Sequence, residues 1–452
     1  MSTRHSVKLN RELCVGCTNC IKRCPTEAIR VRDGKAQISD ARCIDCGECI
    51  RACPHHAKSA SMDSFEQLSA WPYKVALAAP SLYAQFGPPA TRAKVLAALS
   101  TIGFDAVSEV AWGAEVVTAN TARYLRESMD KAQGPLISSA CPVVVRLIQM
   151  RYPNLLENLV PFDSPMEVTA RQARADASRR TGLPPEKIGI FFISPCPAKR
   201  TAVHNPLAGM TSNVNGVIAI SDAYPLILAN LEKIESGKKD EKFEEMAGSV
   251  GVRWAYAGGE AIALQTERYL AVDGINNVIA ILEEVENERL HDVDFIEANS
   301  CVGGCIGGPL TVANRFSAHA RQRAFVAAAA AASEASATVS KKAQLPRLEP
   351  WAQLPGPNPA MQLDDDIIQA LQKYEHMKKI VAELPGLDCG ACGAPDCEAL
   401  AEDIVKGEAV ETDCIFKLKE RIRSVAAQMV DLEHEMNRHV QQGGRDQDAA
   451  RQ

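Results

Sequence analysis

From about residue 73 to residue 320, short apolar runs alternate with segments in which apolar residues recur every three or four positions. The runs favour buried strands and the spaced positions favour helices, an alternation typical of an α/β domain. Thr91 precedes a helical pattern formed by Val95, Leu96, Leu99 and Ile102, and we expect its hydroxyl to cap that helix. The expected strands are residues 75–79, 136–138, 189–194 and 217–220.

The C-terminal part has a different periodicity, because its apolar residues recur at alternating spacings of three and four. These make about three heptads, the short end of what supports a coiled coil. We predict a helix that pairs with a second copy of the chain, and a helix packed on its own protein is the alternative. The polar tail after Gln441 is expected to be disordered. The seam consists of Ile415, Leu418, Ile422, Val425, Met429, Leu432 and Met436.

The N-terminal part carries an internal repeat of two cysteine motifs. Each copy has the spacing C-x2-C-x2-C-x3-C-P, in which three thiolates bind one 4Fe-4S cluster and the fourth reaches the other cluster. Zinc is the alternative to two such clusters. Between the copies, Asp33-Gly34 predicts a hairpin turn. The first copy holds Cys14, Cys17, Cys20 and Cys24, and the second holds Cys43, Cys46, Cys49 and Cys53.

A further motif, C-x2-C-x4-C-x16-C, is formed by Cys389, Cys392, Cys397 and Cys414. It predicts a separate cluster module, again with zinc as the alternative. The preceding stretch is rich first in alanine, which can extend a helix, and then in proline, which favours a linker. The expected domains are a two-cluster ferredoxin-like domain (1–72), the α/β domain (73–323), an Ala/Pro-rich linker (324–364), the cluster module (365–414), a coiled-coil helix (415–441) and a disordered tail (442–452).

Composition narrows the classes of function. Of the 452 residues, 46% are hydrophobic, enough for a large core. The net charge is −6 without a basic stripe, so nucleic acid is not an expected ligand. No apolar run approaches the ~18 residues of a membrane span and no signal peptide is evident, so we expect a cytoplasmic protein that binds no membrane. In that reducing compartment, sixteen cysteines indicate metal or redox chemistry rather than disulfides.

Four cysteines lie outside these motifs. Cys141 in SSACPVVV and Cys196 in ISPCPAK each follow an apolar strand, and Cys301 and Cys305 lie together in EANSCVGGCIGGP. Open α/β sheets place their ligand sites at the carboxyl ends of the strands. We therefore expect these four thiols to hold one more buried cubane.

With these residues the chain resembles the FeFe hydrogenases. That family has the motifs T-S-C-C-P-x-W, M-P-C-x-x-K and E-x-M-x-C-x-x-x-C-x-x-G-G, which map in order onto residues 138–144, 194–199 and 297–308. The resemblance implies a hydrogenase-type α/β catalytic domain of two lobes with parallel sheets. Beside it we expect a small α+β bacterial-ferredoxin domain and a small α-helical iron-sulfur module that ends in the coiled-coil helix.

The resemblance also implies an H-cluster, in which a 4Fe-4S cubane is tied through one cysteine to a diiron subcluster with CO, cyanide and azadithiolate ligands. A bare cubane is the alternative. Together with the other three sets, this gives four 4Fe-4S clusters. By motif position, Cys141, Cys196, Cys301 and Cys305 hold the cubane, Cys305 bridges to the diiron subcluster, Lys199 hydrogen-bonds a cyanide, and Ser194, Pro195 and Asn299 belong to the same binding site.

The chain also departs from the family. Ala140 stands at the position of the proton-relay cysteine, and a methyl group carries no proton. Where the relay glutamates are expected, after Glu115, this chain has Asn120 and Thr121. Because one positioned acid-base group is typically worth ~100- to 10,000-fold, we expect slow turnover. The other replacements are Val144 for a tryptophan, and Ser194 and Asn299 for two methionines.

This set of changes is similar to the sensory branch of the family, in a form without a PAS domain. The branch implies an H2 sensor with slow reversible H2 oxidation, whose electrons relay through the 4Fe-4S clusters and whose partner is a signalling kinase or phosphatase. The other hypothesis is a catalytic hydrogenase linked to a ferredoxin-like electron donor or acceptor, or an electron-transfer subunit of a larger complex. In either case the reaction interconverts H2 and protons, and whether the chain is an efficient enzyme stays open.

Overall fold

The computed structural model describes residues 5–128, 134–207, 211–231, 234, 247–336 and 345–449. Its contacts divide the chain into two compact units. The first unit joins Met1–Leu13 to Ser39–Met361, and the second joins Cys14–Ile38 to Gln362–Gln452. The first ferredoxin-type cysteine motif therefore lies in the same unit as the C-terminal cysteine motif. The second ferredoxin-type motif lies in the unit that holds the α/β domain.

A four-stranded parallel sheet, with strand order β6-β5-β8-β9, forms one half of the α/β domain. Its strands are apolar on both faces, as is typical of parallel sheets covered by helices. Val75 and Leu77 of β5 pack with one helical layer, and Ala76 and Ala78 pack with the other. The strands are β5 (Tyr73–Ala78), β8 (Ile188–Ser194) and β9 (Gly216–Ala219), close to the expected ranges, and β6 (Ala106–Glu109), for which no strand was expected.

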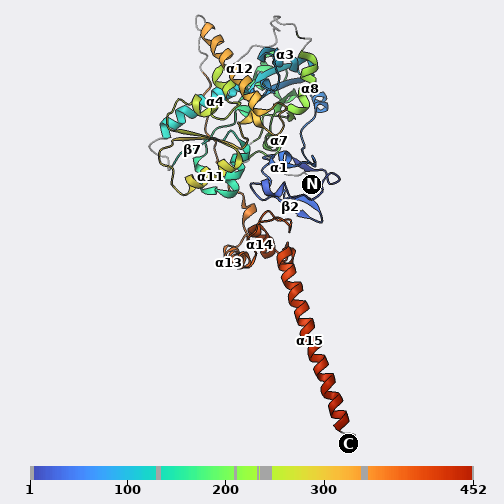
Figure 1. Cartoon of the computed structure of the whole chain (residues 1–452). Helices are drawn as coiled ribbons and strands as arrows, with labels where there is room; N and C mark the ends of the chain where they lie inside the picture. The colour runs from blue at the N-terminus through green and yellow to red at the C-terminus, as the bar shows by residue number, and fades with distance from the viewer. Residues whose placement is uncertain are drawn as a thin grey trace. The chain divides into compact units, whose positions relative to one another are not determined.

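Helices cover both faces of this sheet (Figure 1). On one face, α3 (Arg92–Thr101) packs against α8 (Ile220–Leu231). On the other face, α6 (Pro165–Thr181) contacts the sheet and packs against α4 (Val110–Ser128). As expected, Thr91 caps α3, since its hydroxyl accepts a hydrogen bond from the amide of Lys94 at 3.3 Å.

A three-stranded parallel sheet, with order β10-β11-β7, forms the other half. Ile296 and Ala298 of its central strand pack against apolar residues of α5 and α11. Parallel sheets are therefore present in both halves, as the sequence implies. The elements are β7 (Leu136–Ile137), β10 (Tyr269–Asp273), β11 (Phe295–Asn299), α5 (Pro142–Arg151) and α11 (Ile275–Glu286).

The remaining elements of the first unit are short, except for one long helix. The alanine-rich stretch extends α12 (Arg315–Ser336), as expected. The proline-rich segment beyond residue 345 packs on this unit, because Trp351 donates a hydrogen bond from its ring nitrogen to Asp163 at 3.1 Å. The short elements are β1 (Val7–Leu9), which pairs with β4 (Lys58–Ala60), and α1 (Glu48–Ala52), α2 (Pro80–Tyr83), α7 (Pro197–His204), α9 (Ser249–Arg253) and α10 (Gly259–Ala263).

The second unit combines a hairpin with three helices. Asp33 and Gly34 both have positive φ, as the expected tight turn between two strands requires. A small apolar core, which includes Met377, Ile380 and Leu400, joins two of the helices. The elements are β2 (Ile29–Arg32), β3 (Lys35–Ile38), α13 (Ile367–Glu383), α14 (Cys397–Val405) and α15 (Ile415–Ala449).

Helix α15 is a single long helix (Figure 1). It continues to Ala449, so the expectation of a disordered tail directly after Gln441 is wrong; no proline interrupts its hydrogen bonding over this length. The seven seam residues from Ile415 to Met436 are all exposed. Within the residues described, the seam is thus not covered by its own unit. No described helix is long and apolar enough to cross a bilayer.

Candidate H-cluster and iron-sulfur sites

Three parallel strands deliver the cysteines of the candidate H-cluster site. Cys141 follows β7 and precedes α5, Cys196 follows β8 and precedes α7, and Cys301 follows β11. The first two helices begin with proline, which fits a first helical position without an amide donor. These three cysteines and Cys305 line one cavity of about 110 Å³. The expected meeting of thiols at strand ends is therefore present.

The four thiols lie close enough to influence one another. Enclosure by protein, together with Cys301 and Cys141, raises the pKa of Cys305 to about 12. Burial and the neighbouring thiols likewise raise the pKa of Cys196 and of Cys301. Such thiols stay protonated by themselves, and a bound metal is what converts them to thiolates. None of the sixteen cysteines, all within the described residues, forms a disulfide.

The cavity wall also fits a polar inorganic group. The hydroxyls of Ser81 and Ser300 are buried and lack a hydrogen-bond partner among the described residues, and both residues line the cavity. Buried hydroxyls normally find a partner, so these two point to a ligand that accepts hydrogen bonds. Four soft thiol donors favour an iron-sulfur cluster or zinc over hard cations. The donor set therefore fits a cubane with an attached polar group.

Lys199 and Ala140 face the same cavity. The ammonium of Lys199, on α7, donates a hydrogen bond to the carbonyl of Ala140 at 3.0 Å. The lysine is half-buried, so its charge is held beside an otherwise apolar wall. The residue next to Cys141 thus contributes a methyl group and a carbonyl, and neither can carry a proton at neutral pH.

Three further predicted residues surround the cysteines. The Ser194 hydroxyl accepts a hydrogen bond from the amide of Cys196 at 3.1 Å. Ser194 is fully buried and does not line the cavity, so it orients the loop that carries Cys196. Pro195 and Asn299 line the cavity itself. The Asn299 amide, however, donates to Glu297 at 2.7 Å. Asn299 therefore supports a buried carboxylate as well as the cavity wall.

A pair of buried glutamates completes the wall: Glu297 opens the third family motif, whereas no motif indicated Glu260. Glu260 on α10 accepts a hydrogen bond from the Ser138 hydroxyl at 2.6 Å, and Ser138 accepts one from the amide of Ala140 at 3.3 Å. Burial, together with Glu297, raises the pKa of Glu260 to about 8. Burial raises the pKa of Glu297 as well, although three N–H donors, from Gly258, Ala261 and Asn299, favour its charged form. Glu260 therefore carries a proton at pH 7.

The sequence contains one hint of this pair. Gly258 and Gly259 precede Glu260, and a Cβ at Gly259 would lie 2.2 Å from the carbonyl oxygen of Arg253. Such closeness packs the start of α10 against the end of α9. Glycine pairs before an acid are common for other reasons, so the pattern alone does not identify a site.

The segment expected to contain relay glutamates has structural roles instead. Asn120 donates to the carbonyl of Pro346 at 3.0 Å and accepts from the amide of Leu348 at 3.0 Å. It thus anchors the proline-rich segment. Glu115 accepts a hydrogen bond from the amide of Gly251 at 3.2 Å and does not line the cavity. These residues supply no acid to the cysteine site.

The second ferredoxin-type motif packs against the loop that holds Cys301. Arg51, on α1 between Cys49 and Cys53, donates hydrogen bonds to the carbonyl of Gly307 and to the Cys301 thiol. A Cβ on Gly47 would lie 2.6 Å from Pro309. The motif and the loop are therefore in direct contact within the first unit.

The other two cysteine sets lie in the second unit. Amides donate to the sulfur atoms of Cys14 at 3.4 Å and of Cys24 at 3.2 Å, contacts of the kind that tune cluster thiolates. The C-terminal Cys389, Cys392, Cys397 and Cys414 line one small pocket. The spacing-based prediction that these four cysteines can share a ligand therefore fits the geometry.

Comparison with known families agrees with this arrangement. The model described as the iron only hydrogenase large subunit, C-terminal domain, matches residues 73–266 and 232–309, which together cover more than half of the chain. The chain belongs to this FeFe hydrogenase family. A 4Fe-4S dicluster domain matches residues 6–54, and an Fe-S cluster domain matches residues 384–416. The predicted family and the iron-sulfur, metal-binding and oxidoreductase character are confirmed.

The relatives differ in length. The chain is 27% identical over 362 residues to the periplasmic Fe hydrogenase large subunit of Nitratidesulfovibrio vulgaris, which covers 67% of this chain and 86% of that protein. It is 24% identical over 255 residues to iron hydrogenase 1 of Clostridium pasteurianum (48% and 44%). It is also 24% identical over 341 residues to the NADP-reducing hydrogenase subunit HndD of Solidesulfovibrio fructosivorans (66% and 55%). The chain thus spans about half the length of the last two.

Solved structures with a similar outline include FeFe hydrogenases. One, from work on stepwise H-cluster assembly, has a TM-score of 0.48 and 16% identity, over 65% of this chain and 100% of that chain. A variant from Chlamydomonas reinhardtii has a TM-score of 0.48 and 15% identity, over 65% and 98%.

Proposed function

We propose that the chain is an H2-sensing FeFe hydrogenase, which turns over slowly and relays electrons through four 4Fe-4S clusters. The observation that carries the proposal is Ala140. It lies on the wall of the four-cysteine cavity, next to Cys141, where the family motif has a thiol. A site that can bind H2 but lacks its nearest proton acceptor favours detection over fast turnover.

The residues of the cavity have distinct tasks in this proposal. The H-cluster, when bound, supplies the heterolytic splitting of H2. Cys141, Cys196, Cys301 and Cys305 hold its cubane, with Cys305 as the bridge to the diiron subcluster and its CO, cyanide and azadithiolate ligands. Lys199, whose ammonium is already placed at the cavity wall, donates a charge-assisted hydrogen bond to a cyanide.

Proton handling is assigned to Glu260 and Ser138. The Ser138 hydroxyl lies between the Glu260 carboxyl and the backbone amide of Ala140. It can therefore exchange a proton with Glu260 without any rearrangement of the wall. Because the Glu260 carboxyl is separated from the reacting atoms by the Ser138 hydroxyl, it supports only residual turnover.

The exposed seam of α15 supports the part of the proposal that concerns dimerisation and the transfer of the signal to a partner. Seven apolar residues at heptad spacing are left exposed by the second unit. Apolar residues with this spacing pack against a helix that has the same spacing, and a second copy of α15 provides one. We therefore propose a homodimer through α15. A cytoplasmic kinase or phosphatase is the proposed receiver of the signal.

A catalytic ferredoxin-linked hydrogenase, or an electron-transfer subunit of a larger complex, is the second candidate. One observation favours it: the relatives include a subunit of an NADP-reducing hydrogenase. In that case the cysteine sets serve as a wire between the cavity and an electron acceptor.

One experiment separates the two. The protein is matured with the hydrogenase assembly proteins, after which we expect about sixteen iron atoms in four cubanes and two in the diiron subcluster. Infrared spectra with and without H2 are compared with turnover, beside a catalytic hydrogenase under the same conditions. Slow turnover with a reversible change in the CO and cyanide bands supports the sensor. Comparable turnover supports the enzyme, and no response to H2 excludes H2 as the signal.

A further inference from the structure

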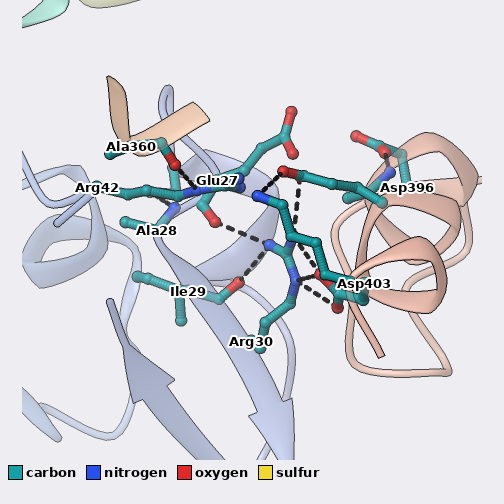
Figure 2. A network of polar contacts seen from close by, with 12 residues as sticks. Glu27, Ala28, Ile29, Arg30, Arg42, Ala360, Asp396 and Asp403 are labelled. Carbon is teal, nitrogen blue, oxygen red and sulfur yellow. Dashed lines mark hydrogen bonds and ion pairs between the residues drawn. The ribbon is translucent and has the colours of Figure 1, made fainter. Parts of the chain in front are cut away.

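In the second unit, a carboxylate from the C-terminal module binds two arginines of the N-terminal hairpin. Figure 2 shows the contact with Arg30. Asp403 accepts hydrogen bonds from Arg30 at 2.8 to 3.0 Å, in a forked arrangement, and from Arg32 at 2.6 Å. The Asp403 side chain is only 4% exposed, and those of Arg30 and Arg32 are 14% and 24% exposed. These residues are far apart in sequence, so the contact is a tertiary one.

Asp403 faces two cations, and a second carboxylate, that of Glu402, lies 3.9 Å from Arg30. A buried carboxylate needs compensation, and a forked guanidinium supplies two parallel donors. Burial opposes the charge on Arg30, but the hydrogen bond to Asp403 and the negative charges of Asp403, Glu27 and Glu402 together outweigh it and raise the pKa of the arginine. The three residues therefore form one ionic unit, which we call the Asp403 clamp.

Backbone contacts hold the two cysteine-bearing loops together beside the clamp. The amide of Val31 donates to the carbonyl of Gly393 at 2.8 Å, and Arg32 donates to the carbonyl of Cys392 at 2.8 Å. A Cβ on Gly393 would lie 1.9 Å from the Val31 carbonyl oxygen, so only glycine permits this approach. Lys22, between Cys20 and Cys24, donates to the carbonyls of Asp388 and Pro395.

On both sides, every contacting residue thus lies within eight positions of a cysteine in the sequence. Lys22 and the hairpin follow the first ferredoxin-type motif, while Gly393 and Cys392 belong to the C-terminal set. Asp403 lies on α14, which begins at Cys397. The clamp therefore fixes the spacing between two cysteine sets that separate parts of the chain provide.

We propose that Asp403, Arg30 and Arg32 are positioning residues that make the cluster bound by Cys14, Cys17 and Cys20 the direct electron partner of the C-terminal cluster. This deepens the proposed function, on which it rests for the source of electrons: splitting of H2 yields two electrons and two protons. One electron leaves the cluster at Cys14, Cys17 and Cys20 for each electron that arrives at the C-terminal cluster, and no bond or proton changes there. The C-terminal set, next to α15, then records the reduction of the first.

The test uses the full-length, cluster-loaded protein reduced with a europium(II) complex, so that no H2 is involved. Electron paramagnetic resonance measures the magnetic coupling between reduced clusters, and hydrogen exchange measures opening at the Val31 amide. Asp403→Asn removes the charge at similar size. Glu398→Gln, on the exposed side of the same helix, is the matched control. Cys397→Ser removes the C-terminal cluster and defines the uncoupled spectrum.

We expect Asp403→Asn to keep its iron, to lose the coupling that Cys397→Ser also abolishes, and to exchange the Val31 amide at least about tenfold faster. Glu398→Gln should match the natural protein. If Asp403→Asn loses iron, Arg32→Gln, which leaves Arg30 on the carboxylate, should show a smaller change in the same direction. Unchanged coupling in an iron-replete Asp403→Asn or Arg32→Gln protein, or in Cys397→Ser, overturns the inference. A failed H2 response would leave these spectra unchanged, so the two failures are distinguishable.

Discussion

Glu260→Gln tests the proton-handling assignment directly. The substitution keeps the size of the side chain and an oxygen that can accept from Ser138, but it removes the titratable proton. Because burial and Glu297 raise the pKa of Glu260 to about 8, this carboxyl is mostly protonated at pH 7. The change therefore removes an acid that is present under working conditions.

The expected loss follows from the geometry of the pair. One positioned acid-base group contributes ~100- to 10,000-fold, or about 3 to 5 kcal/mol of barrier. Glu260→Gln should lower H2 turnover within that range, and so should Ser138→Ala, since the hydroxyl is the direct neighbour at 2.6 Å. Because the two act in series, the double variant should lose little more than the worse single variant. Glu267→Gln, an exposed carboxyl nearby, should stay within about twofold.

The assay is H2 oxidation and H2 evolution across pH 5 to 9, with infrared bands as a check that the site is loaded. Oxidation needs the base form of Glu260, so it should rise with pH toward 8, and evolution should fall above 8. The free energy of unfolding should change with pH in the opposite direction to the rate of H2 oxidation. In the folded chain Glu260 keeps its proton up to about pH 8, whereas in the unfolded chain the carboxyl loses it near its ordinary pKa of 4.5. The free energy of unfolding should therefore fall between about pH 5 and 8, and less so in Glu260→Gln.

Unchanged turnover and pH profiles in both Glu260→Gln and Ser138→Ala, with the infrared bands intact, would refute the reasoning. Protons would then reach the cavity by a route that bypasses these two side chains.

Three other changes test separate parts of the proposal. Lys199→Ala should shift the cyanide bands or prevent retention of the diiron subcluster, whereas Lys199→Arg keeps the charge; identical bands in both would show that the ammonium does not touch the cofactor. Deletion of residues 416–452 should leave the iron content unchanged and weaken dimerisation in sedimentation experiments, and a truncated chain that stays dimeric at equal concentration would contradict the α15 seam. Ala140→Cys should raise turnover, with a gain limited by the absence of carboxyls at Asn120 and Thr121; no gain in a fully loaded protein would show that the thiol position is not limiting.

The cysteine site was predictable because its geometry follows from chain topology. Cys141 and Cys301 follow β7 and β11, neighbouring parallel strands that end at one edge of a sheet, so for these two the sequence pattern translates directly into proximity. Cys196 follows β8 of the other sheet, so its place beside them does not follow from one sheet edge. Glu260 was not predictable in this way. It lies on a five-residue helix without periodicity, and its burial depends on glycine contacts that only the folded chain displays.

The Asp403 clamp shows the same limit at longer range. Arg30 and Asp403 each look like an ordinary surface charge in the sequence, and nothing local connects a hairpin near the N-terminus with a helix near the C-terminus. The hairpin turn at Asp33-Gly34 was predictable, because turn chemistry is local. The partner of that hairpin was not, since pairing between distant segments leaves no periodic trace.

The contact between α1 and the Cys301 loop limits how far this protein can be trimmed. A minimal H2-binding fragment that starts after residue 72 would lose Arg51, the cation that lowers the pKa of Cys301, and would expose the Gly307 carbonyl and Pro309 that the N-terminal part now covers. In such a fragment the loop that carries Cys301 would be less firmly held and the pKa of the Cys301 thiol would be higher, so iron would be harder to load. An engineer in search of a compact H2-responsive unit should therefore retain the chain from residue 39 onward.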